Sequence, residues 1–413
     1  MSVVRNIIMF FAVAMLVACQ GASSSRCEVE GDTLTTEAEL LTIVECNGII
    51  IVDIENPWKE GALLKRYALV HREGIIPENL PEEAELVRVP ITSALVYSSV
   101  HAGAFEELGC IDAVTGVVDA QYYKIPSIIE GLESGKVADA GNSMAPTIEK
   151  IVELSPEAIL ASPFQNAGHG AIEKLGIPII ECADYMESTP LGRAEWIKFF
   201  GELLCKRAEA TEIYNNVVEE YNSLKNKVWN NAKRPMVISE MMTDGVWFMP
   251  GGKSYMAQMF ADAGANYPWS SDKSTGSLQL DFSTVYDKAY NADYWLIKSP
   301  EPNFSLANLE SKYPLNKKFE AFSKGGVYVI NTVESSFYED FPFHPERLLR
   351  EYIILFHPKV LDGDTVYVKT YERGVGFTKA CGTGMTASIV ACTIAHPEMK
   401  NKPIKIYNWG IIE

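Results

Sequence analysis

Strand-like and helix-like hydrophobic patterns alternate through the first half of the chain. The run "RVPITSALVYSSVHAGAFEELG" combines a β-prone apolar stretch, a Ser-Ser turn and a helical segment that ends near Gly109. The same order returns in "SPEAILASPFQNAGHGAIEKLGIPIIEC", with a buried strand at 158–161, a loop at 162–170, a short helix, and a strand after Pro178. Strands that alternate with helices favour a parallel sheet covered by helices, so residues 49–190 are predicted to form one α/β lobe.

A long helical pattern follows this lobe. Apolar residues recur at helical spacing from Arg193 to about Asn230 with no proline between them, which predicts one helix over 191–232 with a length on the order of 50 Å. After Pro235 the strand and helix patterns restart, in "PMVISEMM", "YMAQMFADAGA", "ADYWLIK" and "GGVYVIN". Residues 233–360 are therefore predicted to form a second α/β lobe. The expected fold class is α/β, with two doubly wound lobes joined by a single long α-helix and a short partial strand-loop-helix tail.

The N-terminal residues have the features of an export signal. Arg5 supplies a positive charge, residues 7–17 form an apolar stretch too short to span a bilayer comfortably, and small residues follow. The sequence Leu16-Val17-Ala18-Cys19 resembles the lipobox of bacterial lipoproteins, which implies that 1–18 are removed and that Cys19 is lipidated. Residues 19–48 would then be a tether and N-terminal segment of an extracytoplasmic protein held to the cell membrane by its lipid. An uncleaved anchor and an ordinary signal peptide are the alternatives.

Composition excludes several classes of function. The 413 residues are 47% hydrophobic and 22% charged, so the chain is long enough for two packed units and too apolar to be disordered. A net charge of −18 without a compensating basic block argues against nucleic acid or an anionic membrane surface as a partner. Without Cys19 seven cysteines remain, so at least one thiol stays free, and Cys182 and Cys205 are a candidate disulfide pair. Neither a metal site nor a cofactor is expected.

Two α/β lobes and a long helix behind a lipobox resemble the substrate-binding lipoproteins of ATP-binding-cassette (ABC) importers, in the class that carries cobalamin, haem and iron-siderophores. Three stretches strengthen the resemblance, which runs from about residue 50 to about 358: "GNSMAPTIEKIVELSPEAIL", "LGIPIIECADY" and "MPGGKSYMAQMFADAGANYPW". The resemblance implies a monomer that binds one large chelate and delivers it to a permease dimer and its ATPase. Another doubly wound protein with a long connecting helix is the alternative fold.

The resemblance places the ligand in a shallow cleft between the lobes, against loops at the carboxyl ends of strands. The residues that these loops carry are Tyr97, Ser98, Ser99, Tyr122, Tyr123, Phe164, Gln165 and Tyr185 in the first lobe, and Trp247, Phe248, Lys253, Trp269, Phe337 and Phe341 in the second. Aromatic rings suit a large planar or macrocyclic ligand, although each of them could instead be buried in a core. Few Arg or Lys residues stand in these loops, so a corrinoid is favoured over an iron-siderophore or haem.

The resemblance also implies one acidic residue on each lobe for docking on arginines of the permease. Glu149, in "PTIEKI", matches the first-lobe position. The second-lobe position, in "GGKSY", holds Ser254, so its acidic counterpart is not evident. The alternative is that Glu149 is an ordinary solvated helix residue.

The pattern changes after an amphipathic helix that ends at His357-Pro358, where such binding proteins normally finish. Residues 361–413 resemble the C-terminal part of diaminopimelate epimerase, a cofactor-independent enzyme. In that resemblance Cys381 is one of two proton-transferring thiols. The substrate contacts that it implies come from Glu372, Arg373, Gly382 and Thr383.

The tail carries only half of such a catalytic site. In the enzyme family the other thiol comes from an N-terminal half, where it stands in the sequence Cys-Gly-Asn, and this half has no counterpart here. Cys46 in "VECNGII" is the nearest match, but Gly and Asn do not follow it in that order. A genuine recombination of two genes and an error of gene prediction or assembly would both produce this junction. The incomplete tail favours the error. Solute binding is therefore the leading hypothesis, and amino-acid epimerisation and peptide or protein binding by a surface lipoprotein are the alternatives.

Overall fold

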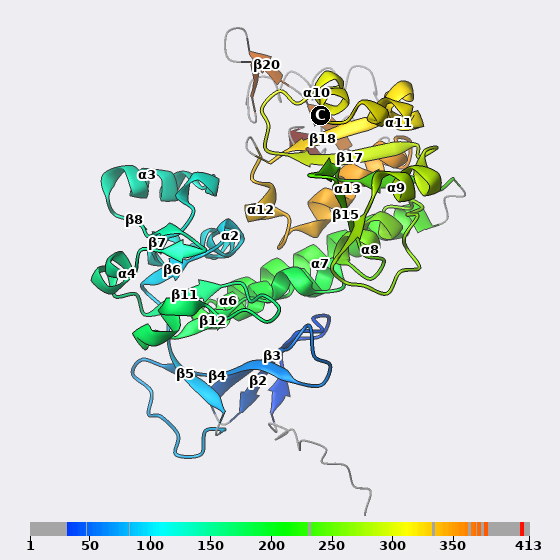
Figure 1. The fold of residues 1–413 in the computed structure, drawn as a ribbon. Coiled ribbons are helices and arrows are strands. Elements are labelled where there is room, and N and C mark those ends of the chain that lie inside the picture. The colour runs from blue at the N-terminus through cyan, green and yellow to red at the C-terminus, as the bar shows by residue number, and fades with distance from the viewer. Residues whose placement is uncertain are drawn as a thin grey trace, which may run out of the picture.

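The computed structural model describes residues 31–361 except 47, 82, 230–232 and 333–334, together with the backbone of four short strands beyond residue 364. Two α/β lobes lie side by side and are joined by helices, and a separate sheet lies beneath the first lobe (Figure 1). This arrangement confirms the predicted fold class, whereas the sheet beneath the first lobe was not predicted.

The first sheet contains five strands in the order β1-β2-β3-β4-β5. Its strands are β1 (Asp32–Thr33), β2 (Leu41–Cys46), β3 (Ile49–Glu55), β4 (Leu63–His71) and β5 (Ala84–Val89). All neighbours pair antiparallel except β4 and β5, which pair in parallel. Because β2 lies within 19–48 and β3 to β5 within 49–190, this N-terminal sheet takes strands from both the predicted tether and the predicted first lobe.

The first lobe is built on a parallel five-stranded sheet with the order β12-β11-β6-β7-β8. Its strands are β6 (Ala94–Val96), β7 (Val114–Val117), β8 (Ala138–Asp139), β11 (Ala158–Ala161) and β12 (Ile179–Glu181), and β9 (Gly141–Asn142) and β10 (Ala145–Pro146) form a hairpin. Its helices are α2 (Ser99–Glu107), α3 (Pro126–Ser134) and α4 (Ile148–Leu154), with short 3-10 turns η1 (Ile111–Ala113), η2 (Ala120–Tyr122), η3 (Gly170–Leu175) and η4 (Asp184–Met186). The predicted strands at 158–161 and after Pro178 are confirmed.

The connection between the lobes is not one helix, as predicted, but three. They are α5 (Pro190–Ala194), α6 (Trp196–Leu203) and α7 (Arg207–Trp229). Cys205 adopts a left-handed φ of +54°, and Lys206 N–H donates to Gly201 O at 2.7 Å, so α6 ends in a Schellman turn. The 23 residues of α7 span about 34 Å.

The candidate pair Cys182 and Cys205 forms no disulfide, and both thiols are free. Cys182 is fully buried and donates to Ile180 O at 3.6 Å, whereas Cys205 is exposed at the helix break.

The second lobe combines a parallel sheet of order β13-β17-β18 with an antiparallel sheet of order β14-β15-β16. The strands are β13 (Val237–Ser239), β14 (Met242–Thr243), β15 (Val246–Pro250), β16 (Ser277–Leu280), β17 (Tyr294–Ser299) and β18 (Val327–Asn331). The helices are α8 (Tyr255–Asp262), α9 (Phe282–Ala289), α10 (Leu306–Lys312), α11 (Glu320–Lys324), α12 (Phe337–Asp340) and α13 (Pro345–Phe356), with a 3-10 turn η5 (Pro314–Lys318). The predicted second lobe and its terminal amphipathic helix are thus present.

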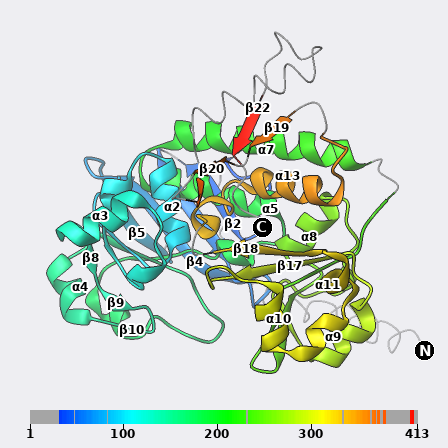
Figure 2. The same ribbon diagram turned by 90° about the horizontal axis from the view of Figure 1, so that it is seen from above.

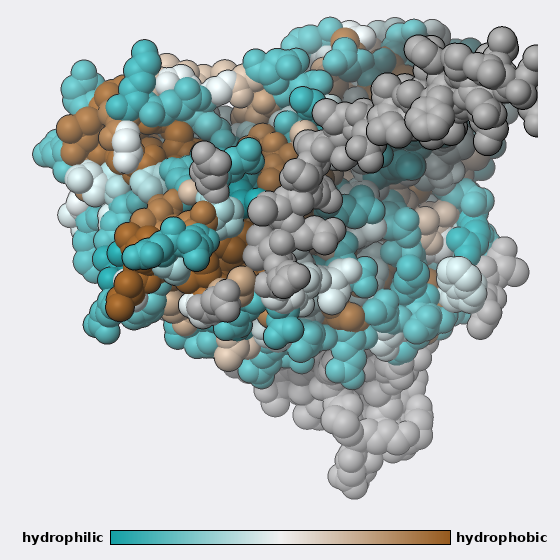
Figure 3. Space-filling view, turned by 90° about the horizontal axis from the view of Figure 1, so that it is seen from below, coloured by the Kyte–Doolittle hydropathy of each residue, from teal (hydrophilic) through white to brown (hydrophobic). Residues whose placement is uncertain are grey.

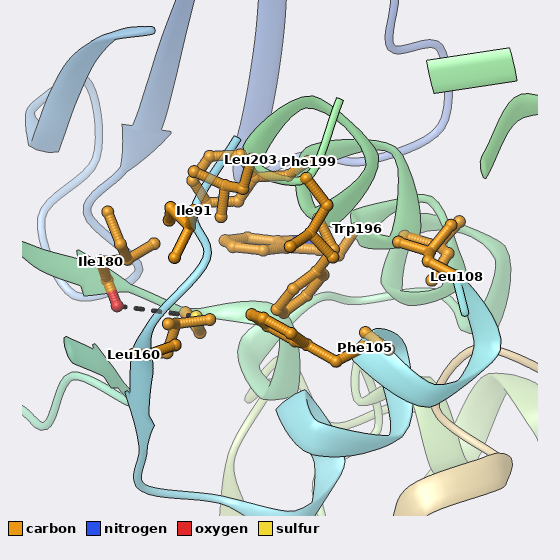
Figure 4. Close-up of a cluster of buried hydrophobic side chains, with 14 of the residues drawn as sticks. Ile91, Phe105, Leu108, Leu160, Ile180, Trp196, Phe199 and Leu203 are labelled. Atoms are coloured by element: carbon orange, nitrogen blue, oxygen red, sulfur yellow. Dashed lines mark hydrogen bonds between the residues drawn. The ribbon is translucent and has the colours of Figure 1, made fainter. Parts of the chain in front are cut away.

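Helix α6 is the centre of the first hydrophobic core. Trp196, Phe199 and Leu203 project from it between α2, with Phe105 and Leu108, and the strand side, with Leu160 and Ile180 (Figure 4). On its other side Phe199 stacks on Tyr67 of β4 at 6.1 Å, so the N-terminal sheet and the first lobe share one core. A single helix therefore fixes both layers against each other.

The second lobe contacts both a connecting helix and the first lobe itself. Helix α13 packs along α7, and α12 packs on α2. The second contact is very close, since a Cβ on Gly103 would lie 2.2 Å from the carbonyl oxygen of Glu339. Phe343 also inserts into the first core, edge-on to Phe200 at 5.7 Å. These contacts hold the lobes close together on one side (Figure 2).

The segment before β2 is attached to the first lobe through its backbone. The buried carboxylate of Glu195 accepts the N–H groups of Thr36, Glu37 and Ala38 at 2.7–3.0 Å. The buried carboxylate of Glu187 accepts the next two N–H groups, from residues 39 and 40, at 2.9 and 3.0 Å. Five successive N–H groups thus bind two carboxylates, which fix the N-terminal sheet to the segment that carries η4 and α5. We call this arrangement the N-terminal anchor.

The described part of the tail consists of strand backbone. β19 (Thr365–Val368) pairs in parallel with β22 (Lys405–Asn408), and β20 (Thr370–Glu372) pairs antiparallel with β21 (Gly376–Thr378). Glu372 ends β20, whereas the lipidation site and the other predicted epimerase residues lie outside the described residues: Cys19, Arg373, Cys381, Gly382 and Thr383. Within the described ranges, no helix has the length and apolar character needed to cross a membrane.

Candidate ligand-binding cleft

A cavity of about 680 Å³ opens between the lobes, within the usual size range of small-molecule sites. One wall, which we call the first-lobe wall, comes from η4 of the first lobe and the connecting helix α5, and the other from β15, the start of α8, and α12. Aromatic and thioether side chains make up much of the lining: Tyr185, Phe248, Tyr255, Phe337, Tyr338, Phe341, Met186, Met241, Met256 and Met259. Such walls suit a large ligand with apolar faces, because rings stack and methionines adapt to irregular shapes.

The first-lobe wall contains a buried ion pair. Arg193 donates from Nε and Nη2 to Asp184 Oδ2 at 3.1 and 3.0 Å, and His101 Nε2 lies 3.3 Å from Asp184 Oδ1. Burial alone would raise the pKa of Asp184, but Arg193 and His101 hold it below its usual range. The guanidinium carbon of Arg193 lies 4.8 Å from the ring centroid of Tyr255, so this cation also contacts the second lobe.

The second-lobe wall contains a similar pair. Lys298 Nζ lies 2.7 Å from Glu240 Oε1 and 5.9 Å from the ring centroid of Phe337. Burial alone would lower the pKa of Lys298, but Glu240 raises it above its usual value, so the ammonium stays charged. Each wall therefore presents a cation that is already balanced by a carboxylate.

Local sequence explains how these side chains are held. Thr189 caps α5 by accepting the Gly192 N–H at 2.9 Å, and this fixes the short helix that carries Arg193. In the second lobe, Glu240 directly follows β13 and Lys298 is the penultimate residue of β17. Ser254 caps α8, where its Oγ accepts the Ala257 N–H at 3.2 Å.

The structure separates the predicted second-lobe residues into three groups. Phe248, Phe337 and Phe341 line the cleft, and Lys253 lines a neighbouring cavity. Trp247 and Trp269 are 0% and 5% exposed, so their assignment to the cleft is corrected. Trp247 stacks on Trp295 at 5.4 Å and donates its indole N–H to Ser239 O, which makes it a core residue.

Of the predicted first-lobe residues, Tyr185 alone lines the cleft. It also lines a smaller cavity of about 180 Å³ with Ser98 and Phe164. The others line neither of these two cavities: Tyr97, Ser99, Tyr122, Tyr123 and Gln165. Tyr123, for example, is buried and donates its hydroxyl to Val96 O at 2.8 Å.

Helix α12 also contacts the first lobe outside the cleft. Glu339 accepts the Lys124 N–H at 3.0 Å, and its backbone lies against Gly103 of α2. The second lobe thereby contacts α2 and the loop after β7, which follow two of the first-lobe strands.

Sequence reasoning missed three charged residues and one phenol of the cleft, namely Arg193, Glu240, Lys298 and Tyr255. Glu240 and Lys298 stand at or just past strand ends, so the rule applied to the other loops would have found them. Arg193 was assigned to the long connecting helix, and nothing in its helical pattern distinguishes a residue of the cleft wall.

The predicted docking residue Glu149 is exposed in the first turn of α4. Ser254, at the corresponding second-lobe position, is buried as the cap of α8 and cannot serve as a surface counterpart. Docking through Glu149 stays a prediction.

Comparison with known proteins agrees with this architecture. A lipoprotein of uncharacterized function from Methanocaldococcus jannaschii is 27% identical over 317 residues, which are 72% of this chain and 74% of the relative. Among solved structures, a periplasmic binding protein from Veillonella parvula aligns with a TM-score of 0.54 at 14% identity, over 79% of this chain and 99% of that one. The periplasmic vitamin B12 binding protein of Vibrio cholerae aligns with a TM-score of 0.50 at 14% identity, over 65% of this chain and 97% of that one.

The tail has a relative of its own. Diaminopimelate epimerase of Clostridium acetobutylicum is 52% identical over 52 residues, which are 13% of this chain and only 16% of that enzyme. The main body instead matches the sequence profile described as periplasmic binding protein over residues 96–333, more than half of the chain. The chain therefore belongs to the periplasmic binding protein family and is a substrate-binding protein of the ABC-transporter type.

Proposed function

We propose that this protein is a lipid-anchored solute-binding protein that captures a corrinoid in the cleft between its lobes and delivers it to an ABC permease. The observation that carries the proposal is the charge balance of the cleft. Its two described cations, Arg193 and Lys298, are each paired with a carboxylate, while rings and thioethers form the remaining walls.

This charge balance distinguishes the candidate chelates. A ferric tricatecholate carries several negative charges and haem carries two carboxylates, so both need cations that are free to pair with them. A corrinoid has apolar faces and a rim of neutral amides, which can stack on rings and form hydrogen bonds with the paired side chains. The similarity in fold to a vitamin B12 binding protein is compatible with this choice.

Ligand titration of the purified full-length protein tests the proposal. We expect saturable quenching of tryptophan fluorescence by cyanocobalamin, and weaker or no quenching by haem or a ferric tricatecholate. Replacing Tyr338, which lines the cleft, by alanine should weaken corrinoid binding about tenfold, since a buried aromatic contact contributes on the order of 1 kcal/mol or more.

Tyr122→Ala is the matched control, because Tyr122 is 67% exposed and does not line the cleft. Saturable binding of haem or the tricatecholate in preference to the corrinoid would refute the ligand assignment. Equal affinities of the two tyrosine variants would refute the assignment of the site.

The same proposal includes membrane attachment and docking. Cys19→Ala should release the protein from the membrane fraction, because the lipid is then absent.

Glu149→Gln should weaken corrinoid uptake by cells and leave corrinoid binding to the purified protein unchanged. Uptake equal to that of the unmodified protein would argue against a docking role for Glu149.

We further propose that the tail has no epimerase activity, because it supplies one of the two thiols that proton exchange requires. Deuterium exchange at the α-carbon of diaminopimelate is the direct test. Exchange that disappears in Cys381→Ala would contradict this proposal.

A further inference from the structure

A second cavity, of about 920 Å³, lies directly beside the cleft. Met186, Ser254 and Thr275 line both cavities, so the two share a wall. The second cavity is bordered by the N-terminal sheet, the loop between η4 and α5, and the loops that precede α8 and β16. Most of the N-terminal side of this cavity comes from residues before 96, outside the region that matches the family profile.

The two cavities differ in chemistry. The second cavity has polar walls without the aromatic side chains of the cleft, and its two lysines, Lys253 and Lys273, have no ion-pair partner among the described residues. Its opposite side carries the carboxylates of Glu39, Glu55 and Glu60. In Figure 3, which shows the molecule from the side of the N-terminal sheet, hydrophilic residues also predominate over the second-lobe half of the surface.

Glycines hold the two lysine-bearing loops against each other. A Cβ on Gly252 would lie 2.4 Å from the carbonyl oxygens of Trp269 and Asp272, so only glycine permits this approach. Lys253 N–H then donates to Ser274 O at 3.0 Å, which links the loop of Lys253 to the loop of Lys273. Both ammonium groups thus belong to one wall of the cavity.

The acidic wall is held by the N-terminal anchor. Glu39 donates its backbone N–H to Glu187 Oε2 at 2.9 Å, and Met186, which separates the two cavities, is the residue before Glu187. The N-terminal sheet is therefore fixed to the same segment that forms the first-lobe wall of the cleft. Both cavities therefore border the segment that the N-terminal anchor holds.

We propose that the second cavity binds a polar, hydroxyl-bearing appendage with a single negative charge, while the macrocycle of the same ligand occupies the cleft. Lys253 and Lys273 would bind a phosphodiester, and the carboxylates would accept hydrogen bonds from sugar hydroxyls. The three carboxylates repel an appendage with several negative charges. This inference rests on the proposed corrinoid function and specifies that the ligand is a complete corrinoid with its nucleotide.

A pair of ligands tests the inference on the full-length protein. Cyanocobalamin contains the nucleotide with its ribose and phosphodiester, whereas cobinamide has the same macrocycle without them. Lys253→Gln and Lys273→Gln should each weaken cyanocobalamin binding about tenfold, the effect of one charge-assisted contact, and leave cobinamide binding unchanged. Lys174→Gln is the control, because this exposed lysine of η3 lines neither cavity.

Each outcome separates the two proposals. If both corrinoids bind with equal affinity and the lysine variants change neither, the second cavity is not part of the site, although the proposed function stands. Equal weakening of both corrinoids would show that the lysines act only on the structure, which also overturns the inference. If neither corrinoid binds, the proposed function fails and this inference fails with it.

Discussion

Glutamine in place of Glu195 is the sharpest test of the N-terminal anchor. The carboxylate is fully buried and binds three backbone N–H groups and the Lys198 ammonium, the last at 2.7 Å. Glutamine has the same shape but no charge. Both oxygens of the carboxylate accept hydrogen bonds, so the NH₂ group of glutamine would replace one acceptor and point at N–H or ammonium donors. Hydrogen bonds to a charged group contribute about 1.5–3 kcal/mol each, so we expect a loss of about 3 kcal/mol in the free energy of unfolding.

Equilibrium denaturation by urea measures this loss. Trp196 is a suitable fluorescent reporter, because it is fully buried and donates its indole N–H to Glu187 within the anchor. The control is Glu209→Gln, which removes an exposed carboxylate that pairs with Lys206 at 2.9 Å and should leave the midpoint almost unchanged. Equal midpoints for the two variants would refute the argument that the anchor stabilises the N-terminal sheet.

Three further predictions concern the lobe contacts and the anchor. Gly103→Ala should displace α12 from α2, because the added Cβ would lie 2.2 Å from Glu339 O. Such overpacking lowers the free energy of unfolding by about 1–3 kcal/mol, so we expect a lower Tm and weaker ligand binding. Phe343→Ala should cost about 3–5 kcal/mol in urea denaturation by emptying a buried site beside Phe200, and a loss below 1 kcal/mol would contradict that packing. Burial raises the pKa of Glu187 from 4.5 to about 7, so the protonated carboxyl stabilises the fold at low pH and this contribution is lost as pH rises from about 4.5 to about 7. Glu187→Gln should therefore flatten the dependence of Tm on pH in that range, and an unchanged dependence would contradict the shift.

The strands and helices of both lobes could be predicted because their patterns are local. An apolar run such as 158–161 has few alternatives to a buried strand, and the structure places β11 there. The break before α7 could not be predicted in this way. Glycine is the usual residue at the left-handed position that ends a helix, and Cys205 occupies it here, so the composition gives no signal.

The candidate site was predictable only in part, because it depends on contacts between distant segments. Phe337 and Phe341 were found because aromatic residues cluster in a loop of the second lobe. Gly103 looks in the sequence like a weak point of a helix, and its role as the contact point for α12 becomes evident only when residue 339 is placed against it. The same contact brings the second lobe against α2 and the loop after β7, and no local pattern contains that information.

The N-terminal anchor has a consequence for which substitutions the chain can tolerate. Its contacts from positions 36–40 are made chiefly by backbone N–H groups, which nineteen of the twenty amino acids share. Exchanges of side chain at positions 36, 37 and 39 should therefore affect the attachment little, with the exception of proline, which lacks the N–H, whereas Ala38 and Leu40 also pack against the first core. The strict requirement falls on the two glutamates about 150 residues later. Homologous N-terminal segments could accordingly be exchanged between relatives that keep both glutamates, provided that the segments keep the apolar side chains at positions 38 and 40.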